Sequence, residues 1–217
     1  MTVLQVLGLH PYKLGSFEDY ILAFAQQMNS RGYKAVYIFS GEPHPYIAER
    51  LEELDCQYYV QENPRGLHDH YKFISRLIMV IREFKVDIIQ AQFFPHTNFA
   101  VLAGFLTSTP VFQTVHTLSS LNKKPVRTVG IVKSVVSSLI SKKIFAVSGA
   151  VRKDLIDTYR ISAKKIQILY NGISLSKYVS RISEHALHDS LGVSSQAKIV
   201  LTIAHARPEK GLEYLIR

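Results

Sequence analysis

His116 stands where a side chain can do chemistry, because it comes directly after the apolar run 111–115. That run predicts a buried strand, and a histidine at the end of such a strand can hydrogen-bond a substrate hydroxyl or take part in proton transfer. A structural histidine bonded to a nearby backbone carbonyl would show the same spacing, so the sequence leaves both interpretations open. His10 and His96 follow other predicted strands and are weaker candidates.

A second candidate site lies in the last twenty residues. Residues 198–204 predict a buried strand, residues 205–211 a loop that ends in glycine, and residues 212–217 the first turns of a helix. The free N–H groups of a helix start and the positive end of its dipole favour a phosphate. Arg207 and Lys210 add two cations beside them, so this tail predicts an anion-binding loop that opens a second, doubly wound domain.

Ligands of open parallel sheets bind beyond the carboxyl ends of the strands, so the residues after each predicted strand form a candidate cleft. Glycine, histidine and small polar residues gather in these segments, which are 10–16, 41–44, 92–96, 116–120, 148–149, 171–172 and 205–211. Gly15 and Ser16 occupy the first strand-to-helix turn, where the backbone can approach a ligand closely.

Several common site patterns are absent from the sequence. The G-x-G-x-x-G fingerprint and the G-x-x-x-x-G-K-[ST] loop are missing, which argues against a dinucleotide dehydrogenase and a P-loop enzyme. No G-x-S-x-G is present, which argues against a nucleophile-elbow hydrolase. The pairs His68/His70 and His185/His188 have no third ligand in sequence, so no metal site is expected.

The elements that would hold these residues alternate between strand and helix. Strands are predicted at 3–9, 35–39, 57–60, 86–90, 111–115, 144–147 and 166–169, and helices at 16–31, 45–54, 67–84, 98–106, 126–141 and 150–159. Ser16 is the expected N-cap of the first helix and Gly32 its C-terminal stop. Short apolar strands separated by helices predict an α/β fold, a Rossmann-like parallel sheet with helices on both faces.

Length and composition are typical of one domain of about 150–200 residues plus a remainder. The 217 residues are 47% hydrophobic and 20% charged, as in an ordinary globular protein. No apolar run approaches the roughly 18 residues that a membrane span needs, and residues 1–8 lack the features of a signal peptide. The single cysteine, Cys56, excludes an internal disulfide and indicates a reducing compartment, so a cytoplasmic protein is expected.

The net charge of +9 comes from the second half of the chain. Residues 1–119 hold 9 Lys and Arg against 11 Asp and Glu, whereas residues 120–217 hold 17 against 6. This half is expected to face an anionic partner, or to be no more than a solvated basic surface. Residues 123–143 place cations around apolar residues, as either a helix on an anionic bilayer or an ordinary core helix would. Nucleic acid is disfavoured because no binding motif or basic-aromatic platform is present.

Three blocks of the chain carry a family resemblance. They are I-F-A-V-S-G-A-V-R-K-D-L at 144–155, K-I-Q-I-L-Y-N-G-I at 165–173 and L-T-I-A-H-A-R-P-E-K-G-L at 201–212, with weaker matches at 87–92 and 114–116. In this order the blocks resemble glycosyltransferase family 4, the retaining GT-B enzymes that use nucleotide sugars. The resemblance implies an acceptor-side Rossmann-like domain over residues 1–172, an interdomain linker over 173–196, and the start of an incomplete nucleotide-sugar-binding domain over 197–217.

The resemblance also implies roles for particular residues. His116 would be catalytic and would line the cleft near the transferred sugar. The donor diphosphate would be held by Lys210, Arg207, His205 and Gly15. The acceptor or the cleft would be contacted by Ser16, His10, Ser148, Asn171 and Gly172. No metal or other cofactor is implied, because protein cations would neutralise the leaving diphosphate.

The chain departs from the family pattern at several positions. Where the family usually has a second glycine, two histidines, an aspartate and an arginine, this chain has Ser16, Gln90 and Gln92, Ser174, and His205. Arg207 is a candidate substitute for that arginine. The glutamate-rich donor motif of the family would lie beyond Arg217.

The predicted function is transfer of a sugar from a nucleotide-sugar donor to a hydroxyl of a glycan, polysaccharide or glycolipid, with retention of configuration. We expect the chain alone to be inactive, because the donor-side domain would be needed to bind the nucleotide sugar. Two alternatives stay open: a non-catalytic phosphate-binding Rossmann module, and another GT-B enzyme such as a sugar epimerase. A peripheral anionic membrane on the cytoplasmic side, carrying a lipid-linked acceptor, is a further expected partner; nucleic acid is not.

Overall fold

The computed structural model describes residues 1–93, 96–118, 128–173, 184–204 and 210–216. The chain divides into two compact units, Met1–Gly172 and Ile173–Arg217. All strands of the described residues belong to the first unit, which therefore positions the candidate site around His116.

The described strands form one parallel sheet of seven strands in the order β3-β2-β1-β4-β5-β6-β7. They are β1 (Thr2–Leu7), β2 (Lys34–Phe39), β3 (Gln57–Val60), β4 (Ile88–Gln92), β5 (Val111–Val115), β6 (Lys143–Ala146) and β7 (Ile166–Ile168). The chain runs outward from β1 to β3, then returns to the other side of β1 and continues to β7. The sheet therefore has a topological switch between β1 and β4, and the predicted Rossmann-like α/β fold is confirmed.

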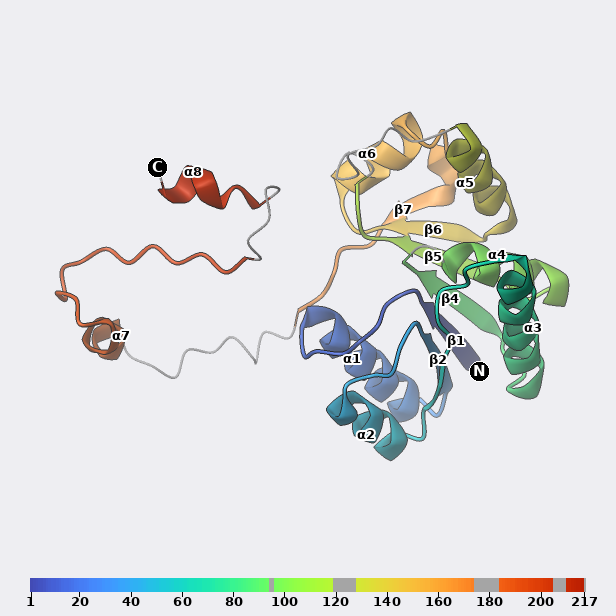
Figure 1. The fold of residues 1–217 in the computed structure, drawn as a ribbon, viewed down its shortest axis with the longest axis horizontal. Coiled ribbons are helices and arrows are strands. Elements are labelled where there is room, and N and C mark those ends of the chain that lie inside the picture. The colour runs from blue at the N-terminus through green and yellow to red at the C-terminus, as the bar shows by residue number, and fades with distance from the viewer. Residues whose placement is uncertain (94–95, 119–127, 174–183, 205–209, 217) are drawn as a thin grey trace. The chain divides into compact units, whose positions relative to one another are not determined.

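Helices cover both faces of this sheet (Figure 1). They are α1 (Ser16–Ser30), α2 (Pro45–Glu53), α3 (Leu67–Glu83), α4 (His96–Thr107), α5 (Thr128–Ile140) and α6 (Gly149–Asp157). On the α1 face, Ile21 and Ile47 of α1 and α2 pack against Val3 and Tyr37 of the sheet. On the opposite α4 face, a separate core joins α3 and α4 to side chains of alternate parity, such as Leu4 and Ile89. Alternation along each strand therefore decides which face each side chain reaches.

The first helix begins one residue before the predicted cap. Gly15 is the N-cap, in extended conformation with φ −158° and ψ −172°, and Ser16 is already helical. The prediction that Ser16 caps the helix is wrong because the backbone N–H of Asp19 donates to the Gly15 carbonyl at 2.9 Å, which closes the first turn on Gly15. Gly32 follows the C-cap Arg31 with φ +67°, so the predicted C-terminal stop is confirmed.

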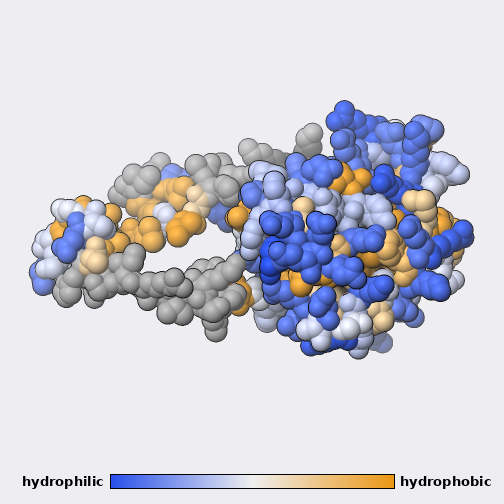
Figure 2. All heavy atoms as spheres, turned by 90° about the horizontal axis from the view of Figure 1, so that it is seen from below, coloured by the Kyte–Doolittle hydropathy of each residue, from blue (hydrophilic) through white to orange (hydrophobic). Residues whose placement is uncertain are grey.

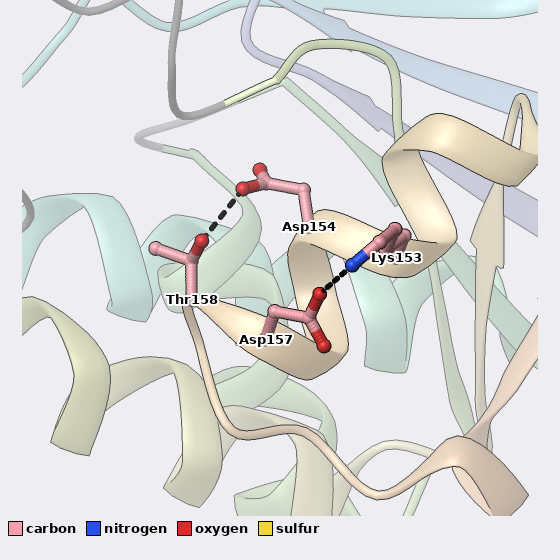
Figure 3. A network of polar contacts seen from close by, with 4 residues as sticks. All are labelled: Lys153, Asp154, Asp157 and Thr158. Atoms are coloured by element: carbon pink, nitrogen blue, oxygen red, sulfur yellow. Dashed lines mark hydrogen bonds and ion pairs between the residues drawn. The ribbon is translucent and has the colours of Figure 1, made fainter.

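Side-chain caps and short polar contacts define two other helices. His44 accepts a hydrogen bond from the backbone N–H of Tyr46 at the start of α2. Ser148 Oγ accepts one from the backbone N–H of Val151 at 3.1 Å at the start of α6. At the end of α6 the Thr158 hydroxyl donates to Asp154, and Lys153 pairs with Asp157, as Figure 3 shows. The ion pair is exposed, so it contributes little to stability.

The fifth helix has its polar and apolar sides reversed relative to an ordinary surface helix. Its buried residues are Ser137 and Ser138, while Val132 and Leu139 are 56% and 67% exposed. Gln113 of β5 donates from Nε2 to the Ser137 hydroxyl at 2.9 Å, so hydrogen bonds hold α5 to the α4 face. This arrangement leaves an apolar stripe on the outer side of α5.

The described part of the second unit contains two short helices, α7 (Glu184–Leu191) and α8 (Leu212–Ile216). Helix α8 confirms the predicted helix start at residue 212. The predicted strand at 198–204 is wrong: these residues form no strand, and Val200 and Ile203 are 77% and 90% exposed. Figure 2 shows hydrophobic residues at the surface of this unit. A strand needs a hydrogen-bonded neighbour, and no strand of the described residues pairs with this one.

Several element boundaries in the first unit also differ from the prediction by one or two residues. Strand β4 occupies residues 88–92 rather than 86–90, and α4 begins at His96 rather than at 98. Val86 is buried although it precedes the strand, so its apolar character placed the predicted start of the strand two residues too early. In the part of the chain that the structure describes, no helix is both long and apolar enough to cross a bilayer. The assignment of residues 197–217 to a second Rossmann-like domain stays a prediction.

Candidate active site

The carboxyl ends of β1, β4, β5 and β6 lie next to one another along one edge of the sheet. At the topological switch, the backbone N–H of Gly8 after β1 donates to the Gln92 carbonyl of β4 at 3.0 Å. A Cβ atom on Gly8 would lie 2.6 Å from the carbonyl oxygen of Phe93, closer than real Cβ atoms come. Glycine at this position therefore allows the two strand ends to meet.

His116 follows β5 at this edge and is held on several sides. Its Nε2 lies 2.8 Å from Oε1 of Gln92. Its ring stacks on Phe93, with centroids 4.5 Å apart and planes inclined by 15°, and meets the edge of Phe17 at 6.1 Å. The side chain is half-buried, and burial lowers the pKa of the imidazole below its ordinary value. His116 is therefore neutral at physiological pH and rigidly placed.

Behind His116 lies a chain of hydrogen-bonded amide and hydroxyl groups, which we call the glutamine network: Gln5, Gln90, Gln92, Tyr20 and Thr114. Nε2 of Gln92 donates to the Tyr20 hydroxyl at 2.9 Å and to Oε1 of Gln5 at 3.3 Å. Nε2 of Gln5 donates to Oε1 of Gln90 at 2.7 Å, and Nε2 of Gln90 donates to the Thr114 hydroxyl at 3.3 Å. The network joins three neighbouring strands and α1 on the α1 face.

The interior position of this network is unusual for side chains of its kind. Gln5 has no exposed surface and Gln92 only 2%. Burial raises the pKa of the Tyr20 hydroxyl, although its hydrogen bonds with Gln92, Gln5 and Gln90 oppose that shift. A buried amide is costly unless it is hydrogen-bonded, so the geometry of these groups is tightly constrained.

Phe93 carries backbone strain at the same place. Its φ is +61°, in the left-handed region that L-residues with bulky side chains seldom adopt. The ring packs edge-on against Phe17 with centroids 4.8 Å apart, in addition to its stack on His116. Such strain persists only where the surroundings enforce it, and it often accompanies functional sites.

The remaining residues predicted near the cleft have local structural partners. His10 Nε2 lies 2.7 Å from the Glu42 carbonyl, and the Ser148 hydroxyl caps α6. Gly15 is the N-cap of α1, with the buried Glu18 carboxylate close beside it, and Ser16 is exposed. No hydrogen bond or ring contact within the described ranges joins any of these to His116.

The other predicted residues lie at the end of the first unit or in the second. Asn171 and Gly172 are exposed. Lys210 is exposed just before α8. Arg207, His205 and Ser174 lie outside the described residues. The proposed roles of all these residues stay predictions.

His96, the weaker histidine candidate, has a different setting. It begins α4 with no exposed surface, and its ring lies 4.6 Å from that of Phe73 between α3 and α4. Neither ring nitrogen has a hydrogen-bond partner among the residues described. Burial lowers its pKa to about 4, an effect that the nearby Leu7 backbone offsets only in part. His96 is therefore a neutral core residue rather than part of the cleft.

The described residues offer no metal site, and their surface hollow lies away from His116. No group of three or more His, Cys, Asp and Glu side chains there could hold a metal ion. A shallow hollow on the outer side of α3 is lined by Ser75, Ile78, Met79, Arg82 and Glu83. Because the end of α3 leads into the start of β4, this hollow lies at the opposite edge of the sheet from His116. The strand ends around His116 are thus the best candidate site in the described structure.

The family model of Glycosyltransferase Family 4 matches residues 17–177, well over half of the chain. The chain belongs to glycosyltransferase family 4. The match includes α1, the glutamine residues of β4, and His116. The candidate site therefore lies almost wholly within the segment that defines the family, with Gln5 and Gly8 just before it.

Solved structures show the same fold. A glycosyltransferase from Rickettsia africae ESF-5 is 19% identical, with a TM-score of 0.69 over 90% of this chain and 50% of that one. Alr3699/HepE of Anabaena in complex with UDP is 18% identical, with a TM-score of 0.66 over 88% and 50%. The UDP-GlcNAc 2-epimerase of Methanocaldococcus jannaschii is 15% identical, with a TM-score of 0.52 over 79% and 46%. The family 4 chain spans about half the length of these structures. No curated protein matches it.

Sequence reasoning missed most of the groups around His116 in this family 4 chain. No role near the site was predicted for Tyr20 or Phe17. Gln90 and Gln92 were noted as departures from the family pattern, without a role. Their signal was two amides at positions i and i+2 of a buried strand, which must face the same side and must find partners there.

Proposed function

We propose that this chain is the acceptor-side part of a glycosyltransferase that moves a sugar from a nucleotide-sugar donor to a hydroxyl of a glycan, polysaccharide or glycolipid, with retention of configuration. The observation that carries the proposal is the position of His116. It stands at the carboxyl edge beside the topological switch, neutral, stacked on Phe93 and bonded to Gln92. A neutral imidazole can both donate and accept hydrogen bonds, which suits a sugar hydroxyl.

The donor part of the proposal draws on a related fold. Structures of Alr3699/HepE are described in complex with UDP, with UDP and glucose, and with UDP-glucose. In our proposal the equivalent donor of this protein is a nucleoside diphosphate sugar. Lys210, with Arg207 and His205, would neutralise its diphosphate, so that no metal ion would be needed. Gly15, Ser16, Asn171 and Gly172 would border the cleft, with His10 and Ser148 further along the same edge.

The proposal is tested by a sugar-transfer assay on the intact protein, with UDP-glucose and other nucleotide sugars as donors. His116→Ala is expected to lower the rate about 10²- to 10⁴-fold, as for loss of a group that assists proton transfer. His68→Ala is the matched control, because His68 is exposed in the first turn of α3. A His116→Ala enzyme that keeps full activity would remove His116 from the mechanism.

The 217-residue chain alone is proposed to be inactive in this assay, because the donor would lack the groups of a complete second domain. Turnover by the purified chain at a rate close to that of a longer polypeptide would contradict this proposal. The configuration of the product at the anomeric carbon, read by NMR, tests retention separately.

A sugar epimerase is the second candidate, because structures of UDP-GlcNAc 2-epimerases match this chain with TM-scores from 0.52 to 0.57. An epimerase needs no acceptor. Incubation with UDP-GlcNAc alone distinguishes the two functions, since an epimerase would form the 2-epimer and a transferase would not.

The outer side of α5 supports a membrane-bound acceptor. Val129, Val132, Val136 and Leu139 are each at least 49% exposed, and no Asp or Glu occurs between Asp87 and Asp154. Such a surface, with Lys133 exposed on the helix, fits an anionic bilayer on the cytoplasmic side, where a lipid-linked acceptor would be presented.

Co-sedimentation with anionic vesicles at low and high salt tests this part of the proposal. The double variant Val132→Asp/Leu139→Asp is expected to lose binding. Leu67→Asp, which changes a side chain that is 87% exposed on α3, is expected to keep it. Equal binding by all three proteins would exclude α5 as the contact.

A further inference from the structure

The hydrogen bond between His116 and Gln92 has only one possible direction. The group that Gln92 offers to His116 is Oε1, 2.8 Å from Nε2, and an amide oxygen can only accept. The proton of a neutral His116 therefore resides on Nε2. Nδ1 is then the unprotonated nitrogen, and it makes no hydrogen bond with any residue that the structure describes.

The orientation of the Gln92 amide depends on groups that His116 does not touch. Nε2 of Gln92 donates to Oε1 of Gln5, and Nε2 of Gln5 donates in turn to Oε1 of Gln90. Rotating the Gln92 amide by itself would set its oxygen against the Gln5 oxygen. Rotating Gln5 as well would move the same conflict to Gln90. The ring proton of His116 can thus move from Nε2 to Nδ1 only if all three amides turn together.

Burial makes this constraint strong. Gln5 and Gln92 lie inside the sheet, where water cannot compensate an unmatched pair of oxygens. The Tyr20 hydroxyl accepts from Gln92 and donates to Oε1 of Gln90 at 3.3 Å, which is the same direction as the amides. All of these hydrogen bonds therefore run in one consistent direction.

We propose that the glutamine network sets the tautomer of His116, with the proton on Nε2, and that Gln92 is a positioning residue that leaves Nδ1 as the hydrogen-bond acceptor for a substrate hydroxyl. The role toward substrate rests on the proposed transferase function. The tautomer does not, because it can be measured without any substrate.

The test uses ¹⁵N-histidine-labelled protein of 217 residues at neutral pH, with the His116 signals assigned by their loss in His116→Gln. The ¹⁵N shifts of the two ring nitrogens are expected to show a protonated Nε2 and an unprotonated Nδ1. A proton on Nδ1 in the unaltered protein would overturn the proposal.

Three variants test the coupling. Gln92→Leu and Gln5→Leu are expected to give a mixture of tautomers, the second although Gln5 makes no hydrogen bond with His116. Gln92→Glu is expected to keep the Nε2 proton and to raise the His116 pKa by one unit or more, because a carboxylate favours imidazolium. If the tautomer is unchanged in Gln92→Leu and Gln5→Leu, the network does not set it.

Gln113→Leu is the matched control, since it removes a buried glutamine of β5 whose side chain bonds on the other face, to Ser137 of α5 and to Ser141 just after that helix. It is expected to leave the His116 spectrum unchanged. Should Gln5→Leu fail to fold, Gln92→Glu and Tyr20→Phe still decide the result, because both retain the shape of the original side chain. A normal tautomer with no transferase activity would refute the proposed function alone.

Discussion

Two histidines at the same edge of the sheet are held in opposite ways. His116 on the α1 face is half-buried, bonded to Gln92 and stacked on Phe93. His96 on the α4 face is fully buried against Phe73, without a hydrogen-bond partner in the described structure. Burial lowers the pKa of both.

Comparing the two histidines shows that a neutral imidazole is not always available for chemistry. His96 is neutral because its buried surroundings offer too little compensation for a charge, and it has no exposed surface through which to meet a ligand. His116 is neutral as well, but a polar network fixes its orientation while part of its surface stays open. Position at a strand end alone therefore does not identify a functional histidine; its partner and its exposure do.

The largest effect expected from this difference is a loss of folding stability at low pH. His96 has a pKa of about 4 when folded and 6.5 when unfolded. Between these two pH values the unfolded chain therefore binds a proton that the folded chain does not bind. Stability from this group is complete above pH 6.5 and is lost as pH falls toward 4. The loss amounts to about 3 kcal/mol. Urea unfolding at a series of pH values measures it.

His96→Leu should flatten that pH profile without lowering stability at pH 7, because no unpaired ring nitrogen remains. His68→Leu, at an exposed position, should leave the profile as it is. If His96→Leu and the unaltered protein lose stability equally between pH 6.5 and 4, His96 is not the buried neutral group described here.

A smaller effect is expected at Phe93, which sharpens the contrast on the α1 face. Phe93→Ala loses the contacts with His116 and Phe17 and keeps the left-handed backbone strain. Phe93→Gly loses the same contacts but removes the strain, so it should be about 1 kcal/mol more stable than Phe93→Ala. Thermal unfolding of the two variants measures the difference, and the reverse order would show that φ at this residue is not strained.

The smallest effect is expected at Tyr20. Tyr20→Phe removes one hydroxyl from the glutamine network and should cost about 1 kcal/mol. Tyr37→Phe is the control, because the Tyr37 hydroxyl donates to the Ile21 carbonyl and makes no hydrogen bond with the side chains of the network. Both should be similarly stable by urea unfolding, but only Tyr20→Phe should move the NMR signals of His116. Neither should alter those of His96; a change there would mean that the two faces are not independent.

Much of the fold was predictable because local patterns and global packing agree. Apolar runs such as 111–115 matched their strands, and Gly32 ended α1 where a left-handed residue was needed. The prediction was wrong where a hydrogen-bond partner, rather than the local sequence, decides the structure. Residues 198–204 have strong strand propensity, yet a strand cannot form without a neighbour to bond to. Gly15 replaced Ser16 as the cap because the backbone bond to Asp19 closed the turn first.

The candidate site was predictable only in its position. A histidine after a strand pointed to His116, and the family resemblance pointed to the same residue. The glutamine network was not predictable, because it needs the register that brings Gln5 of β1 opposite Gln90 of β4, 85 positions later. The left-handed backbone of Phe93 leaves no trace in the residue type either. Both properties arise from pairing between distant segments.

Gly8 limits which amino-acid substitutions this edge of the sheet can accept. Any side chain there would collide with the Phe93 carbonyl, so even alanine would force the ends of β1 and β4 apart. Natural or laboratory variation at this edge must therefore enter through positions with open space around them, such as the exposed Ser16 and Leu14. A library that randomises position 8 should return glycine almost alone, whereas one at position 14 or 16 should return many residue types.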